Sequence, residues 1–492
     1  MRKSLQALER DMRHAASYSE WHAAGLEHDR LSGANDWKAE DRSAGYDYEL
    51  IRLRLAEIRS ARERNDVNRL VFHLHEGLHG NLGNIANPGL YSVAHVGTKQ
   101  LIEAYLDEVT SALHYLCNGD FIEFGFREKL DFFKTTGGAY GRSALMLSGG
   151  AVLGLFHMGV LKALSEQQLL PSIISGSSVG SIMAAVVGAH TDEELLDIFK
   201  PENLYLNVFR YVGFTGLLKG KPVLDGAHLE ASLEENIPDM TFEEAFRKTG
   251  RAINITVSPY DRHQDARLLN ARTSPNVLVR KAALASCAVP AMFPPVTLWA
   301  KNINGEKVPY IPTRKWVDGS IKDDLPIRRL QRLYGVNHSI VSQTNPHVVP
   351  FMSRAEDQRG ALHQARRVLF ANISLNVNFA LEFVQKGIRW SNDLGLIVDK
   401  AQSVVAQKYM GDINIIPPRK PTNVLRIFRN PSTDDVREFV ETGERATWPK
   451  MDMIRNTTRI SRTFHDCLEK LRAQETERLA RPIRLTSVRQ AQ

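Results

Sequence analysis

A serine in a glycine-flanked turn is the first candidate for chemistry in this sequence. Ser178 stands in the turn GSSVG at 176–180, after a short β-branched run and before the helix-like segment 181–187. A G-x-S-x-G turn between a strand and a helix lifts one serine hydroxyl clear of the backbone. Gly176 and Gly180 allow the tight approach, and the helix that follows presents free amides near developing negative charge. We predict that Ser178 is a nucleophile, although the same pattern also occurs in plain strand–helix connections.

A second glycine-rich turn lies one strand–helix unit upstream. The sequence SGGAVLG at 148–154 follows the apolar run 144–147 and opens a segment with the apolar spacing of a helix. Such a turn binds anions through its amides. A dinucleotide fingerprint starting at Gly149 fails at Ala151, and no Gly-Lys-Ser/Thr ends the turn as in a nucleotide-binding P-loop. An oxyanion hole therefore fits best, with the amides of Gly149, Gly150 and Ala151 as donors.

A serine nucleophile needs a base, and the sequence offers an acid in a tight turn. Asp318 precedes Gly319 in the stretch WVDGS at 316–320, and Gly319 permits a sharp turn beside the carboxyl group. An Asp-Gly pair taken alone is most often an ordinary β-turn. Because Asp318 follows the two glycine turns in the sequence, however, we predict that it is the base.

The order of these three motifs resembles the patatin-like family, whose members use a Ser–Asp dyad and a glycine-rich oxyanion loop. Within that family the sequence is most similar to the intracellular triacylglycerol lipases of fungi and plant seeds. The resemblance covers most of residues 15–350 and is most specific in the three motifs. Further matching stretches lie on both sides of the motifs, at 37–38, 46–48, 77–80, 84–88, 97–99, 285–295 and 324–347.

The glycine loop departs from the family pattern at two positions. The family loop usually reads G-G-G-x-Arg/Lys-G, whereas this chain has Ala151 at the third glycine and Leu153 at the basic position. Gly149 and Gly150 still offer their amides, so the resemblance still implies an oxyanion hole. Loss of the cation removes a contact to an anionic head group, which favours neutral glycerides as substrates.

The resemblance implies that Asp318 acts on Ser178 directly. Aspartate in water has a pKa of about 3.9, so it is too weak a base to take a serine proton there. Burial raises a carboxyl pKa, and a direct hydrogen bond orients the hydroxyl. Acyl transfer would then run through a covalent acyl-serine that water hydrolyses. A Ser–Asp–His triad is the alternative, with His338 or His347 following Asp318 in the chain order of the α/β-hydrolases.

Hydrophobic periodicity divides the chain into three parts. Residues 1–141 are charged and helical in pattern, and 135–141 at their end indicate a linker. Residues 142–350 alternate strand and helix patterns, which predicts an α/β catalytic domain with a mainly parallel sheet. Residues 351–492 are again mostly helical and end in a basic tail. With the resemblance, the expected fold class is a patatin-like three-layer α/β fold flanked by helical N- and C-terminal regions.

Composition limits the classes of protein that fit. The 492 residues are enough for two or three domains, and the three cysteines, scattered and odd in number, indicate neither a disulfide framework nor a metal cluster. The N-terminus lacks the apolar core of a signal peptide, and no apolar stretch is long enough to span a bilayer. We expect an intracellular protein, cytoplasmic or peripheral on a lipid surface, with no metal and no cofactor.

The net charge of +7 is compatible with two kinds of partner, nucleic acid and an anionic membrane surface. No recognition motif accompanies the charge, so nucleic acid is not expected. The aromatic segment 204–218 has basic residues alongside, and it predicts either contact with a membrane or lipid-droplet surface or a buried cap over the core. The basic C-terminal tail is expected to be solvated.

Together these features predict a serine lipase or esterase that hydrolyses long-chain acyl esters, with triacylglycerol as the substrate that the resemblance implies. A phospholipase A or lysophospholipase is the alternative hydrolase, and acyl transfer between glycerides is also compatible with an acyl-serine. A catalytically silent lipid-binding scaffold is the non-enzymatic alternative. The presence of Ser178, Asp318 and the glycine turn argues against it.

Overall fold

The computed structural model describes residues 4–200, 224–261, 265–290, 292–345, 348–349, 410–418 and 430–480. The chain divides into two compact units. The helical unit takes in Met1–Ser143, Tyr334–His338 and Met451–Gln492, and the sheet unit takes in Ala144–Leu333 and Ser339–Lys450. Two features predicted from the sequence, the aromatic segment 204–218 and His347, lie outside the described residues.

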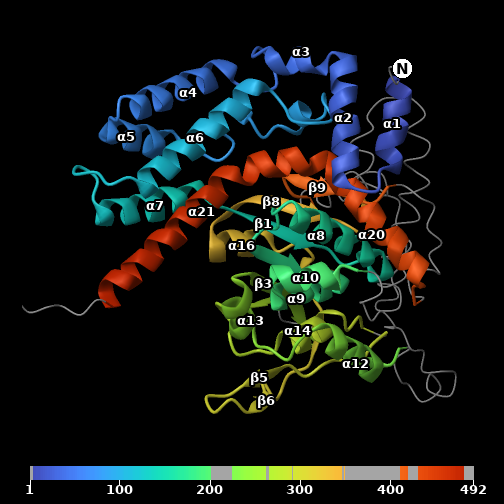
Figure 1. Ribbon diagram of the computed structural model, residues 1–492. Helices are drawn as coiled ribbons and strands as arrows, with labels where there is room; N and C mark the ends of the chain where they lie inside the picture. Colours follow the sequence, from blue (N-terminus) through green and yellow to red (C-terminus); the bar gives the residue numbers. More distant parts are fainter. Residues whose placement is uncertain are drawn as a thin grey trace, which may run out of the picture. The chain divides into compact units, whose positions relative to one another are not determined.

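The helical unit contains seven N-terminal helices and one long C-terminal helix (Figure 1). Their bounds are α1 Leu5–His14, α2 Tyr18–Ser32, α3 Ala34–Ala39, α4 Tyr48–Glu63, α5 Val67–Gly77, α6 Gln100–Asn118, α7 Phe126–Tyr140 and α21 Met451–Ala480, with the 3-10 turns η1 Leu82–Asn84 and η2 Pro88–Tyr91. Helix α6 is the centre of this unit and contacts both α4 and α21. Its Ile102, Leu106, Val109, Leu113 and Leu116 recur every three or four residues and are all buried, which gives one apolar face for the core.

One stretch predicted as a linker is helical instead. Residues 135–140 form the last turns of α7, and the side chains of Thr136 and Tyr140 are buried. Burial of these side chains outweighs the low helix propensity of Gly137 and Gly138. The helical pattern of the N-terminal part therefore continues almost to the first strand.

The sheet unit is built on one mainly parallel sheet with the strand order β4-β3-β2-β1-β8-β9. The strands are β1 Arg142–Leu147, β2 Ile173–Gly176, β3 Ala252–Pro259, β4 Arg267–Asn270, β7 Trp316–Asp318, β8 Val336–Ser342 and β9 Ile413–Ile415, and a separate hairpin joins β5 Trp299–Lys301 to β6 Lys307–Pro309. Strands β1, β2 and β3 run parallel, while β4 and β7 pair with β3 in the antiparallel direction. The register sets Leu147 beside Gly176, so the turns that follow β1 and β2 lie at the same edge of the sheet.

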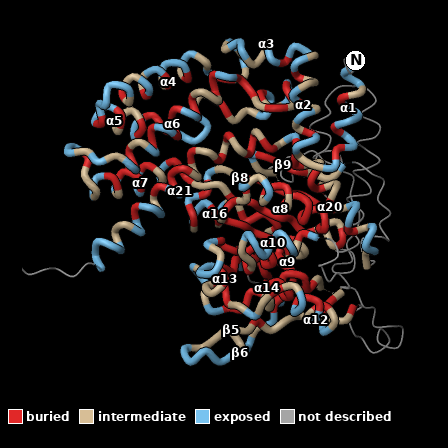
Figure 2. The backbone as a smooth tube through the Cα atoms, in the orientation of Figure 1, coloured by how far each residue is buried: buried red, intermediate tan, exposed pale blue. Residues whose placement is uncertain are grey.

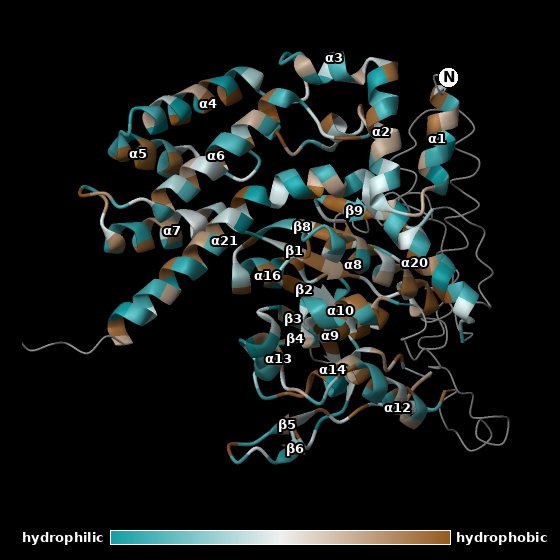
Figure 3. Cartoon of the chain, viewed as in Figure 1, coloured by the Kyte–Doolittle hydropathy of each residue, from teal (hydrophilic) through white to brown (hydrophobic). Residues whose placement is uncertain are grey.

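Helices connect and cover these strands. They are η3 Ala151–Leu155, α8 Phe156–Glu166, α9 Val179–Ala189, α10 Asp192–Ile198, α12 Gly226–Asn236, α13 Phe242–Thr249, α14 Val279–Ser286, α15 Ser320–Asp323, α16 Ile327–Tyr334, α20 Thr433–Thr447 and η6 Trp448–Lys450. Strands β1 and β3 and the helices α8 and α9 are buried along most of their length (Figure 2). Figure 3 shows apolar residues gathered on α8 and α9, as burial against a sheet requires.

A glycine contact joins α8 to α20, although the two helices are far apart in the sequence. A Cβ on Gly159 would overlap the Val440 carbonyl oxygen, and a Cβ on Gly443 would overlap the Phe156 carbonyl oxygen. The two backbones approach so closely that only glycine fits at either position. The C-terminal helix α20 therefore belongs to the sheet unit.

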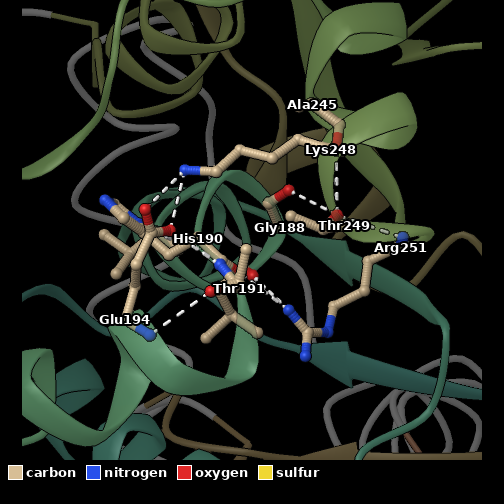
Figure 4. A network of polar contacts seen from close by, with 10 residues as sticks. Gly188, His190, Thr191, Glu194, Ala245, Lys248, Thr249 and Arg251 are labelled. Carbon is tan, nitrogen blue, oxygen red and sulfur yellow. Dashed lines mark hydrogen bonds and ion pairs between the residues drawn. The ribbon is translucent and has the colours of Figure 1, made fainter.

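The far end of α9 is fixed by a polar network (Figure 4). Arg251 donates to the carbonyl oxygens of Val187, at 3.1 Å, and His190, at 2.8 Å, where the helix leaves its last carbonyls unpaired. Thr249 donates to the Gly188 carbonyl at 2.9 Å, and Lys248 pairs with Glu194 of α10. A guanidinium at a helix C-terminus also complements the helix dipole. The network holds the helix whose other end carries Ser178.

The α/β fold class predicted from the sequence, with helical regions before and after a mainly parallel sheet, is confirmed by this topology. The helical C-terminal region splits between the two units, since α20 lies in the sheet unit and α21 in the helical unit.

Candidate active site

Ser178 lies at the junction of β2 and α9, where the chain turns sharply from strand to helix. Its backbone has φ +50° and ψ −128°, a conformation that residues with a side chain rarely adopt. Two glycines make the turn possible, because a Cβ on Gly176 would overlap the Gly180 carbonyl oxygen and a Cβ on Gly180 would overlap that of Leu147. The structure thus places Ser178, partly exposed, at the apex of a strained turn.

The backbone of Ser178 is held on both sides. Its amide donates to the Ser286 hydroxyl at 2.9 Å, and that hydroxyl donates to the Thr256 carbonyl of β3 at 2.8 Å. Its carbonyl accepts the hydroxyl of Ser181 at 2.6 Å. Ser286, at the end of α14, therefore links the nucleophile turn to the neighbouring strand. Because the Ser178 amide is hydrogen-bonded to Ser286, the group that Ser178 offers to the site is its hydroxyl.

Asp318 ends β7 and is buried beside the nucleophile turn. Its Oδ1 accepts the Ser320 amide at 2.7 Å, while Oδ2 is buried without a hydrogen-bond partner among the described residues. Burial raises the pKa of Asp318, and hydrogen bonds from Ser320 and from the Ser178 hydroxyl lower it, which together give a pKa of about 6. A Cβ on Gly319 would overlap the Thr256 carbonyl, so this turn too requires glycine. The chain therefore brings a buried carboxyl group to the serine hydroxyl.

The glycine loop lies against the same serine. A Cβ built on Gly149 would lie 3.4 Å from the Cβ of Ser178. The Gly149 amide, however, donates to Asp324 Oδ1 at 2.9 Å. The amides of Gly150 and Ala151 have no acceptor in the part of the chain that the structure describes. Of the three amides predicted for an oxyanion hole, these two are the ones left to receive a negative charge.

The two departures from the family loop have different surroundings. Ala151 adopts φ +48°, a left-handed conformation that costs a residue with a Cβ about 1–2 kcal/mol. The third glycine of the family pattern would adopt it without this cost. Leu153 follows on η3, where it is half-buried. An apolar side chain therefore stands where the family pattern has a cation.

Two histidines, His157 and His338, offer a contrast with Asp318. His157 on α8 is fully buried between the Ser342 hydroxyl, 2.7 Å from Nδ1, and the Ser148 carbonyl, 2.9 Å from Nε2. Burial lowers the pKa of His157 to about 4, so its imidazole is neutral near pH 7. His338, one of the two histidines weighed for a triad, lies on β8, four residues before the strand ends at Ser342.

Three residues that contact the nucleophile turn or the glycine loop were not predicted as site residues. They are Ser286, which holds the Ser178 amide, Asp324, which holds the Gly149 amide, and Thr344, whose hydroxyl donates to the Gly149 carbonyl. All three fall within or beside stretches that match the family, 285–295 and 324–347. The resemblance therefore identified the stretches that contain these residues, but it did not predict what their side chains do.

The arrangement has the parts of a serine-dependent acyl-transfer site on an α/β sheet: a hydroxyl on a strained turn, a buried carboxyl group beside it and unpaired amides on the opposite loop. Among the described residues, no group of three or more His, Cys, Asp or Glu side chains could hold a metal ion. The helices of the described ranges include none long and apolar enough to cross a membrane.

Comparison with known proteins supports this class. Residues 145–330 match the family model described as patatin-like phospholipase, and residues 1–137 match a domain of unknown function, DUF3336. Triacylglycerol lipase SDP1L of Arabidopsis thaliana is 36% identical over 93% of this chain and 58% of its own length. Triacylglycerol lipase 4 of Saccharomyces cerevisiae is 35% identical over 90% of this chain and 51% of its own length.

A third relative matches over nearly its whole length. Triacylglycerol lipase ptl3 of Schizosaccharomyces pombe is 34% identical, and the match covers 92% of this chain and 95% of the relative. The chain belongs to the patatin-like family, as the three motifs predicted. It spans little more than half the length of the Arabidopsis and Saccharomyces relatives.

Proposed function

We propose that this chain is a serine lipase that hydrolyses long-chain acyl esters of neutral glycerides, with triacylglycerol as the main substrate. The observation that carries the proposal is the buried Asp318 carboxyl group, to which the hydroxyl on the strained Ser178 turn is hydrogen-bonded. Its pKa, raised to about 6, suits a base that works near neutral pH.

The proposed reaction needs only the groups of this site and water. Asp318 accepts the Ser178 proton as Oγ attacks the acyl carbonyl carbon, and the amides of Gly150 and Ala151 stabilise the oxyanion. The intermediate collapses as Asp318 returns the proton to the leaving glyceride alcohol, which leaves an acyl-serine. Water then attacks this ester as Asp318 takes its proton, and the intermediate collapses as Asp318 returns that proton to Ser178 Oγ, which releases the fatty acid.

The substrate class is supported by the relatives and by one residue of the loop. The three relatives carry the name triacylglycerol lipase. Leu153 places an apolar side chain where a cation would face an anionic head group. Since triacylglycerol is insoluble, the proposal includes peripheral binding to the surface of a membrane or lipid droplet, within the cell, without a cofactor or nucleic acid.

Substrate profiling of the purified protein tests the proposal. We expect faster release of fatty acid from emulsified triolein than from phosphatidylcholine or lysophosphatidylcholine at matched lipid surface, and no release from any of them by Ser178→Ala. Faster cleavage of either phospholipid would replace the lipase with a phospholipase. Lipid binding without turnover by the wild type would leave a lipid-binding scaffold.

A phospholipase remains the second candidate function, because the matched family model is described as patatin-like phospholipase. The site chemistry is the same for both substrates, and only the group that leaves differs. A charged residue at the position of Leu153 would favour the second candidate. Leu153→Arg should therefore raise the ratio of phosphatidylcholine to triolein turnover if the loop faces the head group.

A further inference from the structure

The peptide group between Ser148 and Gly149 is held at both ends by buried side chains. Its carbonyl accepts His157 Nε2 at 2.9 Å, and its amide donates to Asp324 Oδ1 at 2.9 Å. Because Nε2 faces a carbonyl, it must carry the proton, and the neutral imidazole then accepts the Ser342 hydroxyl at Nδ1. The plane of this peptide group is thus fixed by partners on two different elements.

The next peptide group is fixed through its carbonyl alone. The Gly149 carbonyl accepts the hydroxyls of Ser148, at 3.0 Å, and Thr344, at 3.3 Å. In a planar trans peptide the N–H points away from the carbonyl, so the Gly150 N–H points away from these two hydroxyls. A Cβ on Gly150 would overlap the Thr344 hydroxyl, so a residue with a side chain would not fit at this position of the loop. The direction of the Gly150 amide therefore depends on how Gly149 is held.

Asp324 connects this loop to the nucleophile turn. It is 1% exposed, and besides Gly149 its Oδ2 accepts the Asn345 side-chain amide at 3.4 Å. Its main-chain carbonyl accepts the hydroxyl of Ser177, the residue before the nucleophile, at 3.0 Å. One residue thus contacts the glycine loop, the nucleophile turn and the segment after β8.

We propose that Asp324 is a positioning residue for the oxyanion hole: by holding the Gly149 amide, it directs the amides of Gly150 and Ala151 toward the acyl carbonyl oxygen. This proposal rests on the proposed function of the site. It assigns Asp324 no contact with the substrate and no share of the proton transfer, which belongs to Asp318. The effect of Asp324 on the reaction therefore falls on the transition state and leaves substrate binding unchanged.

Ionisation of Asp324 provides a second way to test the proposal, through the pH dependence of turnover. Burial raises the pKa of Asp324, hydrogen bonds from Gly149 and Asn345 lower it, and the charges of Asp318 and Asp323 raise it, which together give a pKa of about 7. A negative charge on Asp324 would lie under the loop where the oxyanion forms, and like charges at short range repel. Turnover should fall as Asp324 ionises, on the alkaline side of neutral pH. Asparagine at this position keeps an acceptor for Gly149 but cannot ionise.

The test uses p-nitrophenyl butyrate, a soluble ester, so that binding to lipid surfaces plays no part. Asp324→Leu keeps the number and branching of the side-chain heavy atoms but has no acceptor for the Gly149 amide. We expect kcat to fall about 10- to 100-fold, less than or similar to the loss of one oxyanion-hole donor, with KM within about threefold of the wild type. Asp324→Asn should keep kcat within about threefold at pH 6.5. Asp323→Asn, the matched control on the neighbouring acid that faces Arg329, removes a charge that raises the pKa of Asp324, so it should move the alkaline decline to lower pH and keep kcat at pH 5.5 within about threefold of the wild type.

The pH profile of kcat separates positioning from a structural role. The wild type should show an alkaline decline with an apparent pKa near 7, and Asp324→Asn should remove the decline. If Asp324→Leu fails to fold, this profile decides alone, and an alkaline limb unchanged in Asp324→Asn overturns the proposal. Wild-type kcat retained by a folded Asp324→Leu also overturns it. Failure of the wild type to cleave the ester, or cleavage that survives Ser178→Ala, would instead overturn the proposed function.

Discussion

Two buried carboxyl groups, one in each unit, have pKa values that are shifted in opposite directions. Glu108 on α6 of the helical unit accepts Arg62 Nε at 2.6 Å and Arg59 Nε at 3.4 Å. Burial alone would raise its pKa, but the two arginines outweigh burial and lower it. Asp318 in the sheet unit has no ion pair with a cation in the described ranges, and burial raises its pKa to about 6.

We infer from this difference that Glu108 stabilises the fold and that Asp318 is available for chemistry. A buried carboxylate beside arginines keeps its charge at neutral pH and holds two elements together. A buried carboxyl group without a cation holds its proton more tightly, and this makes it a better base once it is ionised. Stability should therefore depend on Glu108, and activity should depend on Asp318.

The largest effect is expected from removing the base. Asp318→Asn keeps the shape of the side chain but cannot accept the Ser178 proton, so ester turnover should fall by about two to four orders of magnitude. The measurement is kcat on a soluble ester, with His338→Ala as the control that should stay active. A comparable collapse in folded His338→Ala would mean that a histidine takes part and that the dyad is incomplete.

The acid side of the activity profile should report the raised pKa of Asp318. The base works only when ionised, so kcat/KM should fall about tenfold per pH unit below about 6, although an ordinary aspartate would lose activity only near 3.8. Activity at pH 4 would then be about a hundredfold below the plateau. A profile that stays flat down to pH 4.5 would show that Asp318 titrates like an exposed acid.

The stability of the two units should respond to pH in opposite directions. The lowered pKa of Glu108 means that its contribution is present above its ordinary value of 4.5 and is lost as pH falls through the folded-state pKa. The raised pKa of Asp318 means that its contribution is present below 3.8 and is lost as pH rises from there through about 6. Glu108→Gln should therefore lower the free energy of unfolding at pH 7.5 by about 1–2 kcal/mol.

The matched variant on the other carboxyl group should behave differently in the same denaturant titration. Asp318→Asn removes a buried charge that has no cation, so the free energy of unfolding at pH 7.5 should stay the same or rise. Equal destabilisation by Glu108→Gln and Asp318→Asn would erase the distinction between the two carboxyl groups.

The smallest effect concerns strain in the glycine loop. Ala151→Gly should raise the free energy of unfolding by about 1 kcal/mol, because glycine adopts φ +48° without the clash that a Cβ suffers. Ala184→Gly, inside α9, is the matched control and should lower it by about 0.5–1 kcal/mol. If both substitutions destabilise by the same amount, the left-handed conformation of Ala151 carries no strain.

The local motifs of the site could be predicted from the sequence because their geometry is local. Residues 176–180 alone indicate the turn around Ser178, and short-range patterns predict the strand before it and the helix after it. Asp318 also stands beside its own turn glycine. These residues needed no knowledge of how distant parts of the chain meet.

The supporting residues could not be predicted, because their roles depend on contacts across the fold. Asp324 meets Gly149 from 175 positions away, and Ser286 meets Ser178 from 108 positions away. His157 stands among apolar residues of a helix and gave no sign that it would hold a loop carbonyl. The close approach of α8 and α20 rests on Gly159 and Gly443, single glycines whose partners only the fold reveals.

Covalent labelling tests the central claim, that the Ser178 hydroxyl is the nucleophile activated by Asp318. The purified protein is treated with a fluorophosphonate probe at pH 7.5, and the modified peptide is identified by mass spectrometry. We expect one label per chain on Ser178, no label on Ser178→Ala, and labelling of Asp318→Asn slowed by at least about a hundredfold. Labelling of Ser178→Ala at the wild-type rate, or full-rate labelling of Asp318→Asn, would contradict it.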